Sequence, residues 1–377
     1  MSGVCLTSPR RISRPVQVGR VQIGGDAPIS VQSMTNTDTR DVAATVAQIQ
    51  ALAAAGADLV RLSCPDQEAA QAVGAIRAQV TVPLIADIHF DHRLAKIALQ
   101  QGIDGLRINP GNLGSRQRVA EVVQAARERR VPIRIGVNAG SLAKELLARY
   151  GEPCAEAMVE SALHHIHILE ELNYPEIKVS LKASQVGMTV AAYRLLAQQV
   201  DYPLHLGITE AGGLLTGTVK SAIGLGLLLV EGIGDTLRVS LSADPVAEVR
   251  VGFDILKALG LRNRGVNLIS CPTCARQTVP VIELVARLEE RLNHIREPVT
   301  VAVMGCVVNG PGEARESAVG LVGGAGGNLL YRDGQPVGKV TDDEALERLV
   351  QEVEAAAARM RLQTGKPDPT SRNFLKT

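Results

Sequence analysis

The chain has 377 residues, a length typical of two or three domains. Hydrophobic residues make up 46% of it, enough for a folded core, but aromatic residues make up only 2%, which argues against a surface that stacks nucleic-acid bases. The formal net charge of +1 excludes the strong overall field of proteins that bind nucleic acid or anionic membranes.

The first 20 residues carry scattered basic residues but lack the apolar segment of a secretory signal. The longest apolar run, 223–230, is far shorter than the roughly 20 residues needed to span a bilayer. We therefore expect a soluble, cytoplasmic protein.

A repeating unit extends from residue 29 to residue 241: a short strand rich in β-branched residues that ends in polar residues, followed by a helix rich in Ala and Leu. The predicted strands cover residues 29–34, 58–63, 83–89, 105–110, 132–138, 177–184, 203–209 and 236–241. Eight such units over roughly 200–250 residues are typical of an α/β fold, the (β/α)8 TIM-type barrel. A doubly wound sheet is the alternative, but the early strand–helix turns lack its GxGxxG fingerprint.

Each predicted strand has an aliphatic face and a polar face, because side chains two residues apart point the same way. Aliphatic residues such as Leu106 and Ile108 are expected to pack on the outer helices. In a barrel the polar face points inwards, and its carboxyl end forms the mouth where active sites lie. The inward polar residues are Arg61, Ser63, Asp87, His89, Arg107, Asn109, Arg134, Asn138, Lys178, Ser180, Lys182, His205, Thr209, Arg238 and Ser240.

The inward charges are mostly positive. A single buried charge is normally paired inside the protein, but the acids expected here are Asp87 and, just beyond a strand end, Glu210. The inward cations outnumber them: Arg61, Arg107, Arg134, Lys178, Lys182 and Arg238. Arg binds phosphate through its planar fork of donors. We therefore predict that the barrel mouth binds a phosphorylated or multiply anionic small molecule.

The pattern changes after residue 260. The barrel is predicted in residues 1–260, and residues 261–377 are predicted to form a smaller α+β domain. In that domain a strand at 266–270 leads into the sequence CPTC and a helix, and a strand at 299–305 leads into CVVNGPGEA. A final helix covers about 342–361, and the tail from residue 364 is expected to be flexible.

Three thiols, those of Cys271, Cys274 and Cys306, follow two strands whose ends can lie side by side. A zinc site needs a fourth Cys or a His, and His294 lies inside a predicted helix. A redox pair would leave Cys306 unused. Three thiolates suit an iron–sulfur cluster, with one iron left for another ligand or for substrate. Glu313 follows on a turn whose glycines let the backbone fold close to such a cluster.

Several segments, in order and over nearly the whole chain, closely resemble the 4-hydroxy-3-methylbut-2-en-1-yl diphosphate synthase family of the methylerythritol phosphate isoprenoid pathway. They are ADIHF (86–90), LRINPGN (106–112), IGVNAGSL (135–142), VSLKAS (179–184), HLGITEAG (205–212), TLRVSLS (236–242), CPTC (271–274) and GCVVNGPGEA (305–314). No large insertion separates the two predicted domains, which resembles the bacterial form of the family.

The resemblance implies a metal site, a reaction and partners. It implies a [4Fe–4S] cluster held by Cys271, Cys274, Cys306 and Glu313. It implies that 2-C-methyl-D-erythritol 2,4-cyclodiphosphate is opened with two electrons and loss of water to the linear hydroxylated allylic diphosphate. Flavodoxin or ferredoxin would supply the electrons. In a homodimer, the cluster domain of one subunit would close over the barrel mouth of the other.

Together with the residue pattern, the resemblance assigns roles to inward side chains. The substrate would be bound by Arg61, Arg107, Asn109, Arg134, Asn138, Lys178, Lys182, His205, Thr209, Arg238 and Ser240. Glu210 is the preferred proton donor, with Asp87 and His89 as alternatives. Two other classes stay open: a zinc enzyme on a barrel, and a non-enzymatic binding protein whose CxxC domain is structural.

Overall fold

The computed structural model describes residues 7–364, and the tail expected to be flexible lies outside the described residues from residue 365 onwards. The chain divides between Arg262 and Asn263 into two compact units. The first is built on a parallel barrel and the second on a mixed sheet.

Eight parallel strands form the barrel, which confirms the predicted fold class. They are β3 (Ser30–Met34), β4 (Leu59–Ser63), β5 (Leu84–Asp87), β6 (Gly105–Ile108), β7 (Ile133–Asn138), β8 (Ile177–Lys182), β9 (His205–Leu206) and β10 (Thr236–Leu237). The strands from β3 to β8 pair in chain order, and β10 pairs with both β3 and β9. A bridge between Val179 and Leu204 joins β8 to β9 and closes the ring.

The strands β9 and β10 are shorter than the predicted 203–209 and 236–241. The hydrogen-bonded ladder between β9 and β10 ends where the two backbone segments come unusually close. A Cβ on Gly207 would lie only 2.8 Å from the carbonyl oxygen of Arg238. Such an approach is open only to glycine.

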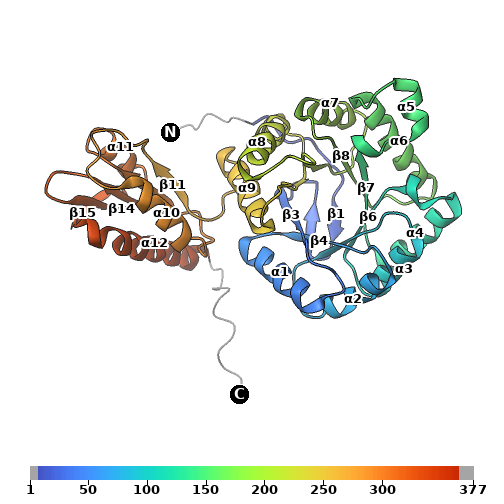
Figure 1. Cartoon of the computed structure of the whole chain (residues 1–377), viewed down its shortest axis with the longest axis horizontal. Coiled ribbons are helices and arrows are strands. Elements are labelled where there is room, and N and C mark those ends of the chain that lie inside the picture. The colour runs from blue at the N-terminus through green and yellow to red at the C-terminus, as the bar shows by residue number, and fades with distance from the viewer. Residues whose placement is uncertain (1–6, 365–377) are drawn as a thin grey trace, which may run out of the picture. The chain divides into compact units, whose positions relative to one another are not determined.

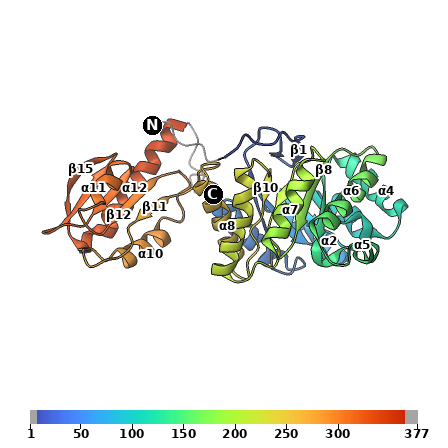
Figure 2. The ribbon, with the colours of Figure 1, turned by 90° about the horizontal axis from the view of Figure 1, so that it is seen from above.

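Helices surround the barrel strands (Figure 1). They are α1 (Val42–Ala55), α2 (Gln67–Arg77), α3 (His92–Gln100), α4 (Arg116–Arg129), α5 (Lys144–Tyr150), α6 (Ala155–Glu171), α7 (Val186–Ala197), α8 (Leu214–Val230) and α9 (Pro245–Ala258). Many of them begin where a side-chain oxygen accepts a first-turn backbone N–H, as at Asp41, Asp66, Asp91, Ser115 and Asp244. Figure 2 shows α7 and α8 side by side on the outside of the barrel.

The aliphatic strand faces pack on these helices, as predicted, and Leu106 and Ile108 belong to that core. At the amino-terminal end of the strands, an antiparallel hairpin of β1 (Val16–Val18) and β2 (Val21–Ile23) supplies a second apolar cluster, in which Val18 and Ile23 pack on Leu59 and Ile85. Apolar residues therefore close the floor of the barrel, and the polar interior opens at the carboxyl ends of the strands.

The second unit holds a five-stranded sheet in chain order. Its strands are β11 (Asn267–Ser270), β12 (Thr300–Met304), β13 (Val319–Val322), β14 (Asn328–Arg332) and β15 (Gln335–Val340), and its helices are α10 (Val281–Arg291), α11 (Gly310–Arg315) and α12 (Asp342–Thr364). The first three strands are parallel and the last two antiparallel to their neighbours. Side chains of α10 and α12 share one apolar core with the sheet, and Ala314 of α11 belongs to another.

Within residues 7–364, the structure contains no helix with the length and apolar character that a membrane crossing requires.

Candidate active site

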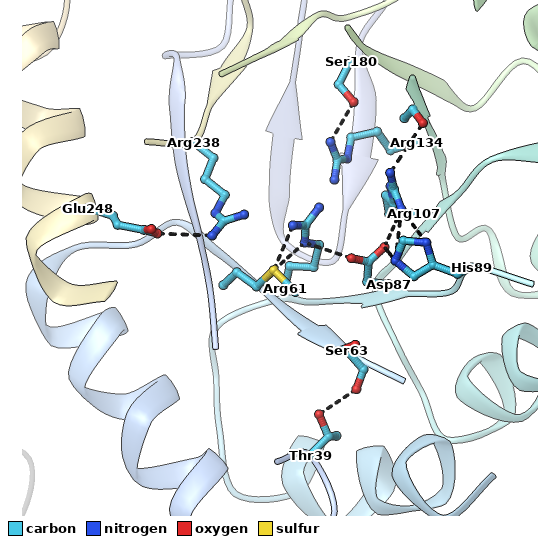
Figure 3. Close-up of polar contacts among 12 residues, drawn as sticks. Thr39, Arg61, Ser63, Asp87, His89, Arg107, Arg134, Ser180, Arg238 and Glu248 are labelled. Carbon is cyan, nitrogen blue, oxygen red and sulfur yellow. Dashed lines mark hydrogen bonds and ion pairs between the residues drawn. The ribbon is translucent and has the colours of Figure 1, made fainter. Parts of the chain in front are cut away.

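Basic side chains converge inside the barrel because their strands place them side by side. The parallel register pairs Arg107 with Arg134, and Arg134 in turn with Lys178. The exposed fractions of Arg61, Arg107 and Lys182 are 9%, 7% and 6%, and those of Arg134 and Lys178 are 1% and 2%. Figure 3 shows the three strand arginines from β4, β6 and β7 close to one another. Parallel pairing of like charges is unfavourable unless an anion is supplied.

Asp87 is the carboxylate at the centre of this cluster (Figure 3). Its Oδ1 lies 3.1 Å from Arg107 Nη1 and 3.6 Å from His89 Nε2, and its Oδ2 lies 3.6 Å from Arg61 Nε. Burial opposes ionisation of Asp87, but Arg61, His89 and Arg107 together outweigh it and hold the pKa of this carboxyl far below its ordinary value. Asp87 is therefore an ionised group that orients cations.

Glu248 of α9 is a second acid, which the sequence analysis missed. Its Oε2 lies 3.5 Å from Arg238 Nη2, and its Oε1 accepts the backbone N–H of Leu241 at 2.9 Å. The signal was present, because Glu248 shares the buried face of the helix with Val249 and Phe253. A carboxylate on an apolar helix face points to a buried partner.

The most deeply buried polar side chains of the interior include Gln32, Arg134, Lys178 and His205, each at most 2% exposed. Arg134 Nη1 donates to Ser180 Oγ at 2.8 Å. Both polar atoms of the Gln32 side chain, His205 Nε2, and Nε and Nη2 of Arg134 are buried without a hydrogen-bond partner among the described residues. Burial, and then repulsion from Arg134, lowers the pKa of Lys178 to about 7 and the pKa of His205 well below its ordinary value. The interior thus holds several buried polar atoms, including two guanidinium donors of Arg134, that have no hydrogen-bond partner among the described residues.

The neutral candidates lie towards the strand ends. Asn109 is 8% exposed, and Asn138, Thr209 and Ser240 are half-buried. Glu210 differs from the other candidates, because it lies exposed in the loop after β9, outside the cation cluster, with a left-handed backbone (φ 53°). Such a backbone is uncommon for a residue other than glycine and is typical of functional loops.

In the second unit, Cys271 lies next to the segment that carries Cys306, so two of the three predicted thiol ligands are close in space. Cys271 follows β11 and Cys306 follows β12, and these strands are parallel neighbours. The backbone N–H of Gly305 donates to Cys271 Sγ at 3.2 Å. Cys274 is exposed, and hydrogen bonds from Arg276 lower the pKa of its thiol. Glu313 lies exposed in the first turn of the short helix α11.

The donor set fits an iron–sulfur cluster in its chemistry. Cys271, Cys274 and Cys306 are free thiols, and Glu313 adds an exposed carboxylate. The segment around Gly305 is tightly packed, because a Cβ there would lie 3.1 Å from Gln277 Cβ and 3.5 Å from Cys271 Sγ. Across the described part of the chain, no three His, Cys, Asp or Glu side chains are gathered closely enough to hold a metal ion as they stand.

Two family models match the chain. The GcpE TIM-barrel domain matches residues 13–253, and the GcpE protein C-terminal domain matches residues 267–355.

Close relatives share one name, 4-hydroxy-3-methylbut-2-en-1-yl diphosphate synthase (flavodoxin). The protein of that name from Magnetococcus marinus is 74% identical over 358 residues, which cover 95% of this chain and 96% of that protein. The protein from Geobacter sulfurreducens is 64% identical and covers 92% of this chain and 98% of its own length. Among solved structures, a dihydropteroate synthase from Xanthomonas albilineans matches 66% of this chain and 98% of its own, with a TM-score of 0.48 and 17% identity.

Proposed function

The chain belongs to the GcpE family, and we propose that it converts 2-C-methyl-D-erythritol 2,4-cyclodiphosphate into 4-hydroxy-3-methylbut-2-en-1-yl diphosphate. Two electrons and two protons are consumed, the ring C–O bond to phosphate breaks, and one hydroxyl leaves as water. The observation that carries this proposal is the excess of buried cations inside the barrel of a chain so similar to enzymes of that name.

The diphosphate of the substrate would supply the missing negative charge. The inward cations are Arg61, Arg107, Arg134, Lys178, Lys182 and Arg238, and two carboxylates, Asp87 and Glu248, contact members of this set. Ionised phosphoryl oxygens accept the charge-assisted hydrogen bonds that guanidinium forks donate. Asn109, Asn138, Thr209 and Ser240 would add neutral donors near the strand ends, and His205, held neutral, would add an uncharged partner deeper down.

Cys271, Cys274, Cys306 and Glu313 would hold a [4Fe–4S] cluster. When bound, such a cluster supplies single electrons and a Lewis-acidic iron. Glu313 would be the most readily exchanged of these four ligands, since Cys thiolates are the usual ligands of such clusters. The glycines around Cys306 would let the chain fold closely about it.

Glu210 is our candidate for the proton donor. It is exposed and lies after the carboxyl end of β9, where barrel enzymes place catalytic groups. Asp87 is a weaker candidate, because neighbouring cations hold it ionised. His89, which lies 3.6 Å from Asp87, remains an alternative.

We also propose flavodoxin as the electron donor, because the relatives' name contains it, and a homodimer. Exposed apolar side chains follow one face of α8: Leu215 at 80%, Val219 at 50%, Ile223 at 52% and Leu227 at 46% exposure. A four-residue spacing places them in one stripe, and a contiguous apolar stripe of this kind marks an interaction site. A second copy of this chain is the proposed occupant, with the cluster unit of one subunit serving the barrel of the other.

Anaerobic purification with iron and sulfide analysis tests this function. We expect about four of each per chain, and turnover of the cyclic diphosphate when a reductant is added. A colourless protein with one tightly bound zinc and no turnover after reconstitution would favour the zinc alternative. Iron and sulfide at the expected level with no turnover would reject the proposed substrate alone.

A further inference from the structure

The guanidinium of Arg61 is held by a sulfur atom as well as by a carboxylate. Met34 ends β3 and is the register partner of Arg61 in β4, so the two side chains point to the same side of the sheet. Nε and Nη2 of Arg61 donate to Met34 Sδ at 3.1 and 2.8 Å. Figure 3 draws both contacts as dashed lines from Arg61 to a sulfur.

Arg61 needs such support because its surroundings are repulsive. It is 9% exposed. Burial lowers the pKa of Arg61 to about 10, which leaves it charged at neutral pH, and both Arg238 and Arg107 act on it as like charges. Its carboxylate partner, Asp87, is shared with Arg107. With only this shared ion pair at 3.6 Å, the guanidinium of Arg61 would be free to rotate away from the mouth of the barrel.

A thioether is suited to orient this fork without neutralising it. Methionine sulfur is uncharged, polarisable and a weak hydrogen-bond acceptor. A carboxylate in its place would form a strong pair with Arg61 and compete with any incoming anion. The sulfur faces the two donors that a phosphate would engage, and its weak hydrogen bonds cost little to exchange.

We propose that Met34 is a positioning residue for anion recognition, which presents Nε and Nη2 of Arg61 to the diphosphate and gives them up when a phosphoryl oxygen arrives. This inference rests on the proposed function, because it takes the cyclic diphosphate as the anion. Met34 is apolar, so it was not among the inward polar residues that the sequence pattern predicted.

The test measures by calorimetry how tightly the cyclic diphosphate binds to the oxidised holoenzyme in the absence of reductant. Met34→Leu keeps the apolar volume but removes the acceptor, and we expect its Kd to rise about tenfold. Met34→Gln, whose oxygen accepts from the same donors, should fall between the wild type and Met34→Leu. Met188→Leu, a matched change on the half-buried face of α7, should bind like the wild type.

A double-mutant cycle separates positioning from packing. If Met34 acts through Arg61, Met34→Leu has no further effect in an Arg61→Gln background. Equal weakening in both backgrounds, or a Met34→Leu protein with wild-type affinity, would overturn the proposal. A wild-type holoenzyme that fails to bind the cyclic diphosphate would instead reject the proposed function itself. Iron content and the thermal unfolding midpoint of each variant confirm that the folded holoenzyme is being compared.

Discussion

Gly136 leaves the space that the side chain of Arg107 occupies: a Cβ built on Gly136 would lie 2.6 Å from Arg107 Nε and 3.0 Å from its Nη2. The same relationship recurs nearby, where a Cβ on Gly207 would lie 2.8 Å from Lys182 Nζ. Both glycines lie on inward positions of the barrel, next to strands that carry the cations. Small residues therefore make room for long basic side chains inside a closed ring of strands.

Gly136→Ala should displace Arg107 and weaken anion binding. The new methyl group would push the guanidinium away from Asp87 and from its place in the cluster, so we expect the Kd of the cyclic diphosphate to rise about tenfold, the value of one charge-assisted hydrogen bond. Calorimetry on the oxidised holoenzyme measures this. Gly140→Ala is the matched control, because nothing lies within 4 Å of a Cβ there. Unchanged binding in Gly136→Ala would show that Arg107 does not contact the ligand.

Lys178 should make the stability of the protein depend on pH. Burial depresses its pKa from 10.5 to about 7, so between about pH 7 and pH 10 the unfolded chain carries a proton on Lys178 that the folded chain lacks. The free energy of unfolding therefore rises with pH in that window, by up to about 1.4 kcal/mol per pH unit. Below pH 7 both states are protonated and the contribution is constant.

Lys178→Met tests this directly. At pH 7 the variant should be more stable than the wild type, and the gain should shrink as the pH rises towards 9.5, as measured by thermal unfolding midpoints without ligand. Lys144→Met, on the exposed surface of α5, is the control and should give a pH-independent difference. A gain from Lys178→Met that stays constant over the whole range would mean that Lys178 keeps its proton in the folded protein.

Much of the barrel site was predictable from alternation within the strands. Arg107, Arg134 and Lys178 were assigned inwards because side chains two residues apart share a face, and the structure buries all three. The strand lengths of β9 and β10 were overestimated, since the aliphatic pattern continues after the ladder ends at Gly207.

The missed contacts join side chains from different helices and strands. Glu248 reaches Arg238 from a helix, and Met34 reaches Arg61 from the neighbouring strand, so neither pairing has a fixed spacing in the sequence. The contact between Cys271 and Gly305 likewise depends on the register of β11 against β12. Two of these contacts depend on strand register and the third on how α9 packs against the barrel, and neither can be read from a local stretch of sequence.

Cys306→Ser should remove the proposed cluster. A serine hydroxyl does not replace a thiolate as a soft ligand, so we expect iron and sulfide to fall to a small fraction of the wild-type values after anaerobic reconstitution. Cys154→Ser, at the start of α6 in the barrel unit, is the matched control and should keep both. Full iron and sulfide in Cys306→Ser would remove Cys306 from the ligand set.

Glu210→Gln and Asp87→Asn should fail in different ways. Glu210 lies exposed and outside the cation cluster, so its amide variant should bind the cyclic diphosphate normally but lose about 100-fold or more in kcat, the usual worth of a general acid. Asp87→Asn should instead raise KM, because Arg61 and Arg107 lose the anion that orients them. Steady-state kinetics with a chemical reductant separate the two. Normal turnover in Glu210→Gln would reject Glu210 as the proton donor.

The exposed stripe on α8 predicts how the chain associates. Burying a leucine or isoleucine side chain against a partner contributes about 1.5–3 kcal/mol, and a charge placed there must be desolvated on association. Ile223→Glu should therefore convert a dimer into a monomer in sedimentation, while the iron content stays unchanged. Leu362→Glu, at an equally apolar but separate position on α12 with 84% exposure, is the control and should remain dimeric. A dimer that survives Ile223→Glu would place the interface on another face, and a wild type that sediments as a monomer would reject the second copy as the partner of α8.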